Sequence, residues 1–231
     1  MDGATPTLGI VIPALNAAPS ISATLEALSA ASAVIDVDML VVDGGSSDDT
    51  IIVAQEHGAR TVTAPPGRGG QLAAGAAAVK GDWLLFVHAD TWMEGEWVSA
   101  AIDFVQVPEN VRRAGYFRLV LDDTTQAARR LECIVAWRTR LMGLPYGDQS
   151  LLLSRELYDT VGGFRPLELM EDVDLMRRIG RRRLVALPAS ARTSAVRYRR
   201  SGYLLRSARN LLCLMLYFLG VPARVLRRLY G

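Results

Sequence analysis

Two aspartates stand at the carboxyl ends of apolar segments that have the composition of buried strands. Asp43 follows Met39–Val42, and Asp90 follows Trp83–Ala89. In an open α/β sheet, ligands bind in the crevice outside the carboxyl ends of parallel strands. There the Asp43 carboxylate would accept a hydrogen bond from a base N–H or a ribose hydroxyl, and the Asp90 carboxylate would bind a divalent cation. The pattern predicts a nucleotide site beside a metal site.

The turn after Asp43 suits the nucleoside end of a nucleotide. Gly44 and Gly45 let the backbone approach a ligand, and we expect Ser46 or Ser47 to cap the next helix. Acidic residues in the first turn of that helix disfavour a phosphate there. An ordinary strand–helix turn, however, has the same composition.

His88 lies two residues before Asp90, so the two side chains can share a cation. Carboxylate oxygen suits Mg²⁺ or Mn²⁺, and imidazole shifts the preference toward Mn²⁺ or zinc. The alternative is a histidine that packs at the end of the strand, with Asp90 alone reaching the ligand.

Two further segments carry candidate contacts. In the turn-rich loop 65–70, Arg68 precedes a predicted helix and could pair with a pyrophosphate, with Gln71 following it into the site. A solvated loop arginine is the alternative. Glu171 and Asp172 begin another predicted helix, where helix capping explains both acids. For catalysis, one of them must reach an acceptor hydroxyl as a general base.

The elements that would position these residues alternate along the chain. We expect strands at 8–13, 38–43, 59–64 and 83–89 and helices at 20–31, 48–57 and 70–79. Farther along, we expect helices at 94–106 and 126–142 and strands at 115–121 and 149–153. This rhythm predicts an α/β fold with a mostly parallel central sheet flanked by helices.

The order and content of these motifs resemble the family 2 glycosyltransferases of the GT-A fold, over almost the whole chain. Val11–Asn16 is similar to the family's first-strand signature, and Val42–Thr50 to its nucleoside-binding turn. His88–Asp90 is similar to its metal-binding Asp-x-Asp, and Glu171-Asp172 to its catalytic pair. The resemblance implies a Rossmann-like sheet, a nucleoside-diphosphate sugar donor, Mn²⁺ or Mg²⁺, and inversion at the anomeric carbon.

Carried over residue by residue, the resemblance makes Asp172 the general base and Glu171 its supporting acid. It places Asp43 on the base or ribose, and Asp90 on the metal and so on the diphosphate. Arg68 or a tail arginine would offset charge on the leaving diphosphate. The remaining expected residues are donor contacts at Pro13, Ala14, Leu15, Asn16, Gly44, Gln71 and Ala89, acceptor contacts at Gly147, Asp148 and Gln149, and tail arginines Arg197, Arg199 and Arg200.

Two departures from the family pattern affect these roles. Ala17 stands where many members have Glu, which leaves the base undetermined, and His88 replaces the first Asp of Asp-x-Asp. Metal affinity without donor should therefore be weak. Within the family, Gly67–Gln71, the His-Ala-Asp variant and Tyr146–Gln149 resemble the small bacterial radical-SAM/selenodomain-associated transferases.

Length and composition predict one globular unit. The chain has 231 residues, half of them hydrophobic, which suffice for a single core. We expect a GT-A domain at 1–200, with a nucleotide-binding half at 1–92 and an acceptor-binding half at 93–200, followed by a helical tail at 201–231. The short polar segment Met1–Thr7 does not resemble a signal sequence, which predicts a cytoplasmic protein. Cys133 and Cys213 are expected to be buried thiols.

The carboxyl end is basic and partly apolar. From Arg192 onward the chain has nine arginines and no acid, and it contains the apolar run Leu211–Val221. This run is shorter than the ~20 residues of a membrane-spanning helix. The tail could lie on an anionic membrane surface, pack on the catalytic domain, or form a homodimer seam. The acidic remainder argues against nucleic acid as a partner.

Two other functions remain open from the sequence. A nucleotidyltransferase of related fold also uses a strand-end aspartate and a metal, but it usually has a glycine-rich loop after the first strand. A non-catalytic sugar-nucleotide binding protein would use Glu171-Asp172 only as a helix cap, and metal-dependent donor hydrolysis would distinguish it from an enzyme.

Overall fold

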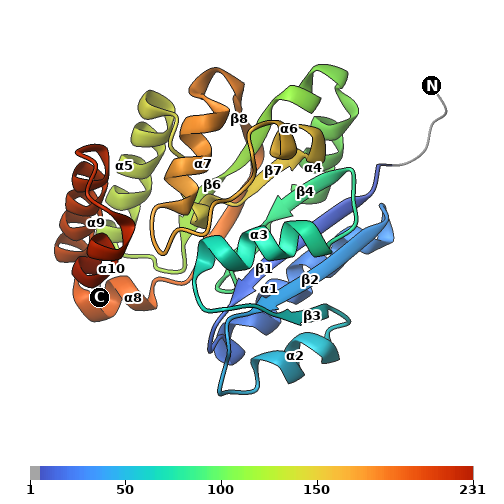
Figure 1. The fold of residues 1–231 in the computed structure, drawn as a ribbon, viewed down its shortest axis with the longest axis horizontal. Coiled ribbons are helices and arrows are strands. Elements are labelled where there is room, and N and C mark those ends of the chain that lie inside the picture. Colours follow the sequence, from blue (N-terminus) through green and yellow to red (C-terminus); the bar gives the residue numbers. More distant parts are fainter. Residues whose placement is uncertain (1–5, 231) are drawn as a thin grey trace.

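The computed structural model of the protein describes residues 6–230. Most of the segment Met1–Thr7, for which the sequence predicted no signal sequence, lies outside the described residues. Residue 231, at the end of the predicted tail, also lies outside them. The described chain folds around an eight-stranded sheet in the order β3-β2-β1-β4-β7-β6-β8-β5 (Figure 1). The strands are β1 (Leu8–Ala14), β2 (Val37–Asp43), β3 (Arg60–Thr63), β4 (Trp83–Phe86), β5 (Thr91–Glu94), β6 (Ala114–Leu121), β7 (Leu151–Ser154) and β8 (Leu184–Thr193).

The amino-terminal half of the sheet is parallel. β1 lies between β2 and β4, both parallel to it, and β3 runs parallel to β2. β7 is antiparallel to β4 and to β6, β6 and β8 are parallel, and β5 is antiparallel to β8. Four of these seven pairings are parallel, which agrees with the expected α/β fold. The carboxyl ends of β1, β2 and β4 therefore share one edge, where a ligand is expected.

Helices cover both faces of the sheet because buried residues alternate between them along the central strands. Val11 packs in the core formed with α3, α6 and α7, whereas Ile10 and Ile12 pack in the core formed with α1 and α4. The helices are α1 (Ala18–Ser29), α2 (Thr50–Glu56), α3 (Arg68–Ala78), α4 (Trp97–Gln106), α5 (Gln126–Met142), α6 (Arg155–Thr160), α7 (Glu171–Ile179), α8 (Val196–Ser201), α9 (Tyr203–Phe218) and α10 (Ala223–Tyr230).

The structure corrects two predicted elements and adds a strand that was not predicted. Glu94 ends β5 and does not begin a helix. β4 ends at Phe86, so His88 and Asp90 lie in the loop between β4 and β5. Arg192 belongs to β8, which the sequence did not predict, and its guanidinium pairs with Glu94 at 2.5 Å. Buried and exposed positions alternate poorly along β8, so it lacks the period-2 pattern of a half-buried strand.

The carboxyl-terminal helices pack back on the protein beside α5 (Figure 1). Cys213 and Leu214 of α9 and Leu226 of α10 are buried in the same core as α7. Cys213 is thus a buried thiol as expected, whereas Cys133 on α5 is exposed, because it faces away from the packed side of that helix. Within residues 6–230, no helix combines the length and apolar character needed to cross a membrane. The division of the chain at residue 201 stays a prediction.

Candidate functional site

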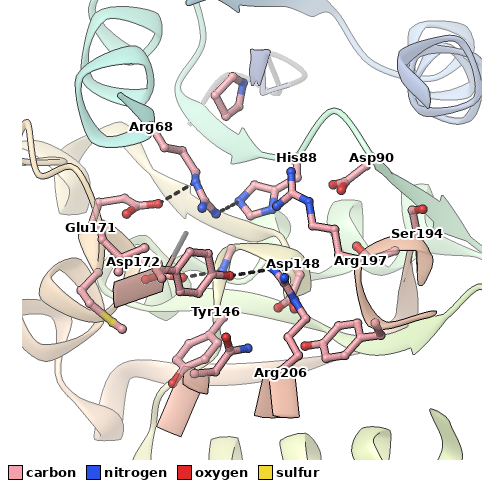
Figure 2. Close-up of a pocket in the computed structure, with 18 of the residues that line it drawn as sticks. Arg68, His88, Asp90, Tyr146, Asp148, Glu171, Asp172, Ser194, Arg197 and Arg206 are labelled. Atoms are coloured by element: carbon pink, nitrogen blue, oxygen red, sulfur yellow. Dashed lines mark hydrogen bonds and ion pairs between the residues drawn. The ribbon is translucent and has the colours of Figure 1, made fainter. Parts of the chain in front are cut away.

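A cavity of about 730 Å³ opens at the carboxyl ends of β1 and β4. Its walls come from the loops after these strands, the amino-terminal ends of α3 and α7, the segment before β7, and helices α5, α8, α9 and α10 (Figure 2). Most residues expected from the sequence line it. They are Pro13, Ala14, Leu15, Asn16, Arg68, Gln71, His88, Ala89, Asp90, Gly147, Asp148, Glu171 and Asp172, whereas Asp43, Gly44 and Gln149 do not.

The loop after β1 is tied to the loop after β2. Asn16, at a left-handed φ of 49°, donates its N–H to Ser46 Oγ at 2.8 Å and accepts from the Ser47 N–H through its side-chain oxygen at 2.9 Å. Neither serine caps α2, whose N-cap is Asp49, so that prediction is wrong. The tie holds Leu15 in the cavity wall with half of its surface exposed, which offers apolar area to a planar group.

Asp43 is buried, with 1% of the residue exposed, and its carboxylate is hydrogen-bonded within its own turn. Its Oδ2 accepts from the Gly45 N–H at 2.8 Å and the Ser46 N–H at 2.9 Å, and its Oδ1 accepts from the Ser46 hydroxyl. In the described chain this carboxylate is thus held by its own turn, and its contact with a base or ribose stays a prediction. The sequence missed this because a short side chain before a glycine turn can satisfy itself locally.

Gln71 joins the ends of β1 and β2. Its buried Nε2 donates to the carbonyls of Ala14 and Val42, each at 2.8 Å. A Cβ on Gly44 would lie 3.0 Å from this nitrogen, so glycine permits the close approach of Gln71 to the turn. The contact of Gly44 with a donor stays a prediction. Gln71 therefore lines the cavity, and its amide holds the ends of β1 and β2 together.

Arg68 connects three parts of the site (Figure 2). Its Nε pairs with Glu171 at 3.0 Å, and its Nη1 lies 3.2 Å from His88 Nε2. Burial, followed by Arg68 and then Arg197, lowers the pKa of His88 well below its usual value, so the imidazole is neutral and Nε2 accepts from Arg68. Glu171 chiefly raises the pKa of Arg68. Arg68 is therefore a fixed cation of the site and not a solvated loop residue.

The surroundings of Asp90 and His88 differ with respect to a metal ion. Asp90 is anchored through its carbonyl, which accepts from the Ser194 N–H at 3.0 Å, and within residues 6–230 its carboxylate makes no hydrogen bond or ion pair. This carboxylate fits a divalent cation. His88 Nε2 does not fit, because a guanidinium occupies its acceptor side. Over the same residues, no three His, Cys, Asp or Glu side chains converge on one point.

The two adjacent acids face different surroundings. Glu171 is buried against Arg68, and burial raises its pKa despite the opposing effect of that guanidinium. Asp172 faces the cavity, where its Oδ2 accepts from the Gly147 N–H at 3.0 Å and its Oδ1 from the Val173 N–H at 2.7 Å. The preceding Met170 has a φ of 65°, a conformation that non-glycine residues rarely adopt. A strained turn thus presents Asp172 to the cavity.

The segment before β7 supplies one open acidic group. Asp148 Oδ1 is buried without a hydrogen-bond partner among the described residues. Burial raises the pKa of Asp148 to about 6, against the opposing effect of Arg138. Gln149 is different, since its Oε1 accepts from the Thr139 hydroxyl at 2.9 Å and its Nε2 donates to the Phe117 carbonyl at 3.2 Å. Gln149 therefore supports the wall from behind.

Several cavity residues were missed by the sequence analysis. Of the three expected tail arginines, Arg197 lines the cavity, whereas Arg199 donates to the Asp122 carbonyl at 3.0 Å outside it. Arg206 also lines the cavity, and its spacing of seven residues from the buried Cys213 was the available signal that it faces inward. Other lining residues that the sequence analysis missed include Arg138, Tyr198, Arg227 and Tyr230.

Comparison with known proteins agrees with this architecture. The sequence profile described as glycosyl transferase family 2 matches residues 9–167. Glucosyl-3-phosphoglycerate synthase of Mycobacterium tuberculosis is 33% identical over 93 residues, which cover 36% of this chain and 29% of that relative. The match thus spans less than a third of the relative's length.

Two solved structures share the fold. The M. tuberculosis synthase in complex with Mn²⁺, UDP-glucose and glycerol 3-phosphate gives a TM-score of 0.55 at 26% identity, over 78% of this chain and 69% of that one. TarS of S. aureus in complex with UDP gives a TM-score of 0.63 at 16% identity, over 81% and 60%, and supports the fold alone. Because the profile covers more than half of the chain, the chain belongs to glycosyl transferase family 2.

Proposed function

We propose that the protein transfers a sugar from a nucleoside-diphosphate sugar to an acceptor hydroxyl with inversion at the anomeric carbon. The observation that carries this proposal is the Asp172 carboxylate, which faces the cavity and is held by the Gly147 N–H at 3.0 Å. An inverting displacement needs one base on the acceptor side and charge stabilisation on the leaving-group side. The two ends of this cavity offer these two environments.

The donor would lie along the β1 and α3 side. Leu15 and Asn16 line this wall, and the tie between Asn16 and the β2 turn holds them in place. The M. tuberculosis synthase, a member of the same fold, binds UDP-glucose together with Mn²⁺. We infer that the nucleoside packs near Leu15 and that the diphosphate extends toward Asp90.

Asp90 would hold a Mn²⁺ or Mg²⁺ ion, and the bound ion would supply charge neutralisation to the diphosphate. With one carboxylate offered by the described residues, the diphosphate must provide further ligands, so metal and donor bind together. Arg197 lies close enough to His88 to lower its pKa and adds positive charge on the same side. Its guanidinium stabilises negative charge on the leaving group.

On the acceptor side, Asp172 would take the proton of the attacking hydroxyl. The buried Oδ1 of Asp148 has no hydrogen-bond partner among the described residues and would accept one from the same acceptor. Glu171 acts through Arg68, because its carboxylate is buried in that ion pair. We therefore assign Glu171 and Arg68 as positioning residues that fix the start of α7.

A panel of nucleotide sugars tests the proposal. In the presence of Mn²⁺, at least one donor is expected to raise the melting temperature, because a ligand that binds the folded state stabilises it by mass action. The shift should shrink strongly when Mn²⁺ is replaced by a chelator. Metal-dependent binding with turnover to a free or transferred sugar supports a glycosyltransferase, whereas binding without turnover supports a non-catalytic sugar-nucleotide binding protein. Release of pyrophosphate from a nucleoside triphosphate would indicate a nucleotidyltransferase.

We further propose a lipid-linked acceptor, reached from an anionic membrane surface. Leu204 and Leu211 of α9 and Ile134 of α5 line the cavity while being largely exposed, with Leu204 at 89%. Nearby, Arg224 and Arg228 of α10 are exposed cations. Apolar side chains beside exposed arginines suit the headgroup boundary of an anionic bilayer and would place the enzyme peripherally on the cytoplasmic face.

Vesicle sedimentation tests the membrane contact. A Leu204→Ser, Leu205→Ser double variant is expected to bind phosphatidylserine vesicles several-fold less than the native protein, and native binding should weaken with salt. Ile52→Ser is the matched control, since Ile52 is also exposed but lies on α2, beside the edge strand β3, and does not line the cavity. Equal sedimentation of all three proteins would reject the contact. A change in oligomeric state without vesicle binding would indicate a homodimer seam instead.

A further inference from the structure

Arg206 is a buried cation that has no acidic partner in the described part of the chain. Its residue is 8% exposed, and its guanidinium donates one hydrogen bond, from Nη2 to the Tyr230 hydroxyl at 3.0 Å. Across residues 6–230, no carboxylate lies within 4 Å of it, and the ring centres of Tyr198 and Tyr230 lie 5.5 and 5.4 Å from its central carbon. Buried charges in proteins are normally paired, because leaving water is costly.

Arg138 of α5 is a second cation of the same cavity whose hydrogen-bond donors lack acceptors among the described residues. Its central carbon lies 3.6 Å from the centre of the Tyr146 ring, which holds the guanidinium plane in place. Its Nε and Nη2 are buried and make no hydrogen bond within the described chain. Two arginines that line one cavity thus have N–H donors without an acceptor among the described residues.

We propose that Arg206 and Arg138 bind a phosphate group carried by the acceptor. Guanidinium forks match the geometry of phosphate oxygens and are the usual partners of a phosphate monoester. The proposal names the substrate class of the acceptor and so rests on the proposed transfer reaction. The phosphate would restore a counter-charge to Arg206 and hydrogen-bond acceptors to both guanidinium groups.

The position of the two arginines favours the acceptor over the donor diphosphate. Arg206 and Tyr146 enter the cavity from the side of α9 and α5, whereas Asp90 lies on the loop after β4 (Figure 2). Asp148 shares the arginine side, but it pairs with neither guanidinium within 4 Å, so it does not neutralise them. A phosphate at Arg206 would leave Asp148 and Asp172 to meet the acceptor hydroxyl.

Two sources of acceptor share this chemistry, a soluble phosphate ester and a lipid phosphate. The apolar Leu204 and Leu211 line the same cavity as Arg206, so a phosphate with an apolar chain also fits. Glycerol 3-phosphate and vesicles containing phosphatidic acid are the two probes. Arg206-dependent binding of glycerol 3-phosphate assigns a soluble acceptor, and Arg206-dependent binding restricted to the vesicles assigns a lipid one.

Calorimetry with inorganic phosphate on the full chain tests the site itself. Arg206→Gln and Arg138→Gln are each expected to weaken phosphate binding by at least about tenfold, the loss expected for one charge-assisted hydrogen-bond pair. Arg200→Gln is the matched control, because it removes the same charge from an exposed residue of α8 that does not line the cavity. Without phosphate, Arg206→Gln should keep or raise the melting temperature, since it removes a buried unpaired charge. A purely structural arginine would instead lower it.

Unchanged phosphate affinity in both variants would overturn the proposal. So would competition between phosphate and UDP with Mn²⁺, because it would assign the arginines to the donor diphosphate. UDP binding with Mn²⁺ should be nearly unchanged in Arg206→Gln. If the native protein binds phosphate through Arg206 but no nucleotide sugar, the transfer reaction is wrong while the phosphate site remains.

Discussion

Replacing Asp172 with Asn is expected to lower sugar transfer by a factor of roughly 10² or more while donor binding and folding stay nearly native. An amide keeps the size of the side chain and can still accept the Gly147 N–H, but it cannot take a proton from the acceptor. The stability loss at the start of α7 should be no more than roughly 1 kcal/mol, because Asn also hydrogen-bonds backbone N–H groups at helix starts. Turnover, donor affinity and melting temperature of the variant are the three measurements.

Glu171→Gln is the comparison that assigns the role. Glu171 is buried in an ion pair with Arg68, so we expect this variant to act through stability and the position of α7. If Asp172→Asn keeps near-native transfer while Glu171→Gln abolishes it at unchanged stability, the base is one residue earlier. If neither variant loses transfer, the two acids only stabilise the helix start, and the proposed mechanism is wrong.

Replacing Asp90 with Ala is expected to remove the metal dependence of donor binding. Asp90 offers a carboxylate without a partner in the described chain, beside a histidine whose Nε2 already accepts from Arg68. Loss of this single protein ligand should weaken donor binding with Mn²⁺ by roughly a hundredfold, to the level seen with a chelator. Calorimetry of UDP binding measures the donor affinity in the presence and in the absence of Mn²⁺.

The matched control for Asp90 is Asp103→Asn, which removes an exposed carboxylate on α4 away from the cavity. It should leave the donor affinity with Mn²⁺ native. Unchanged affinity in Asp90→Ala would contradict the assignment. A His88→Ala variant that loses metal dependence, with Asp90→Ala unaffected, would move the metal to the imidazole and require Arg68 to leave it.

Several features of this protein follow from the sequence alone. The alternation of apolar strands and helices determined the α/β class, because burial on two faces of β1, β2 and β4 requires long apolar runs. The strand-end motif predicted that Asp90 would lie at a ligand-binding edge, since parallel strands end there. The resemblance to the family predicted that Arg68 and Asp172 would belong to the same site. The sequence also required that adjacent acids at one helix start face different surroundings.

Other features were decided only by the tertiary structure. Whether a carboxylate is free depends on its neighbours, and the turn after β2 occupies Asp43 while nothing in the described chain occupies Asp90. The environment of Arg206 depends on contacts of α9 with Tyr198 of α8 and with Tyr230 of α10, which no local pattern encodes. Helical periodicity indicates which side of α9 is buried. It does not indicate that this side faces a cavity, or that no carboxylate among the described residues lies within 4 Å of Arg206. The sequence gives the chemical type of each side chain, whereas its burial and its pairing with other residues depend on the assembled fold.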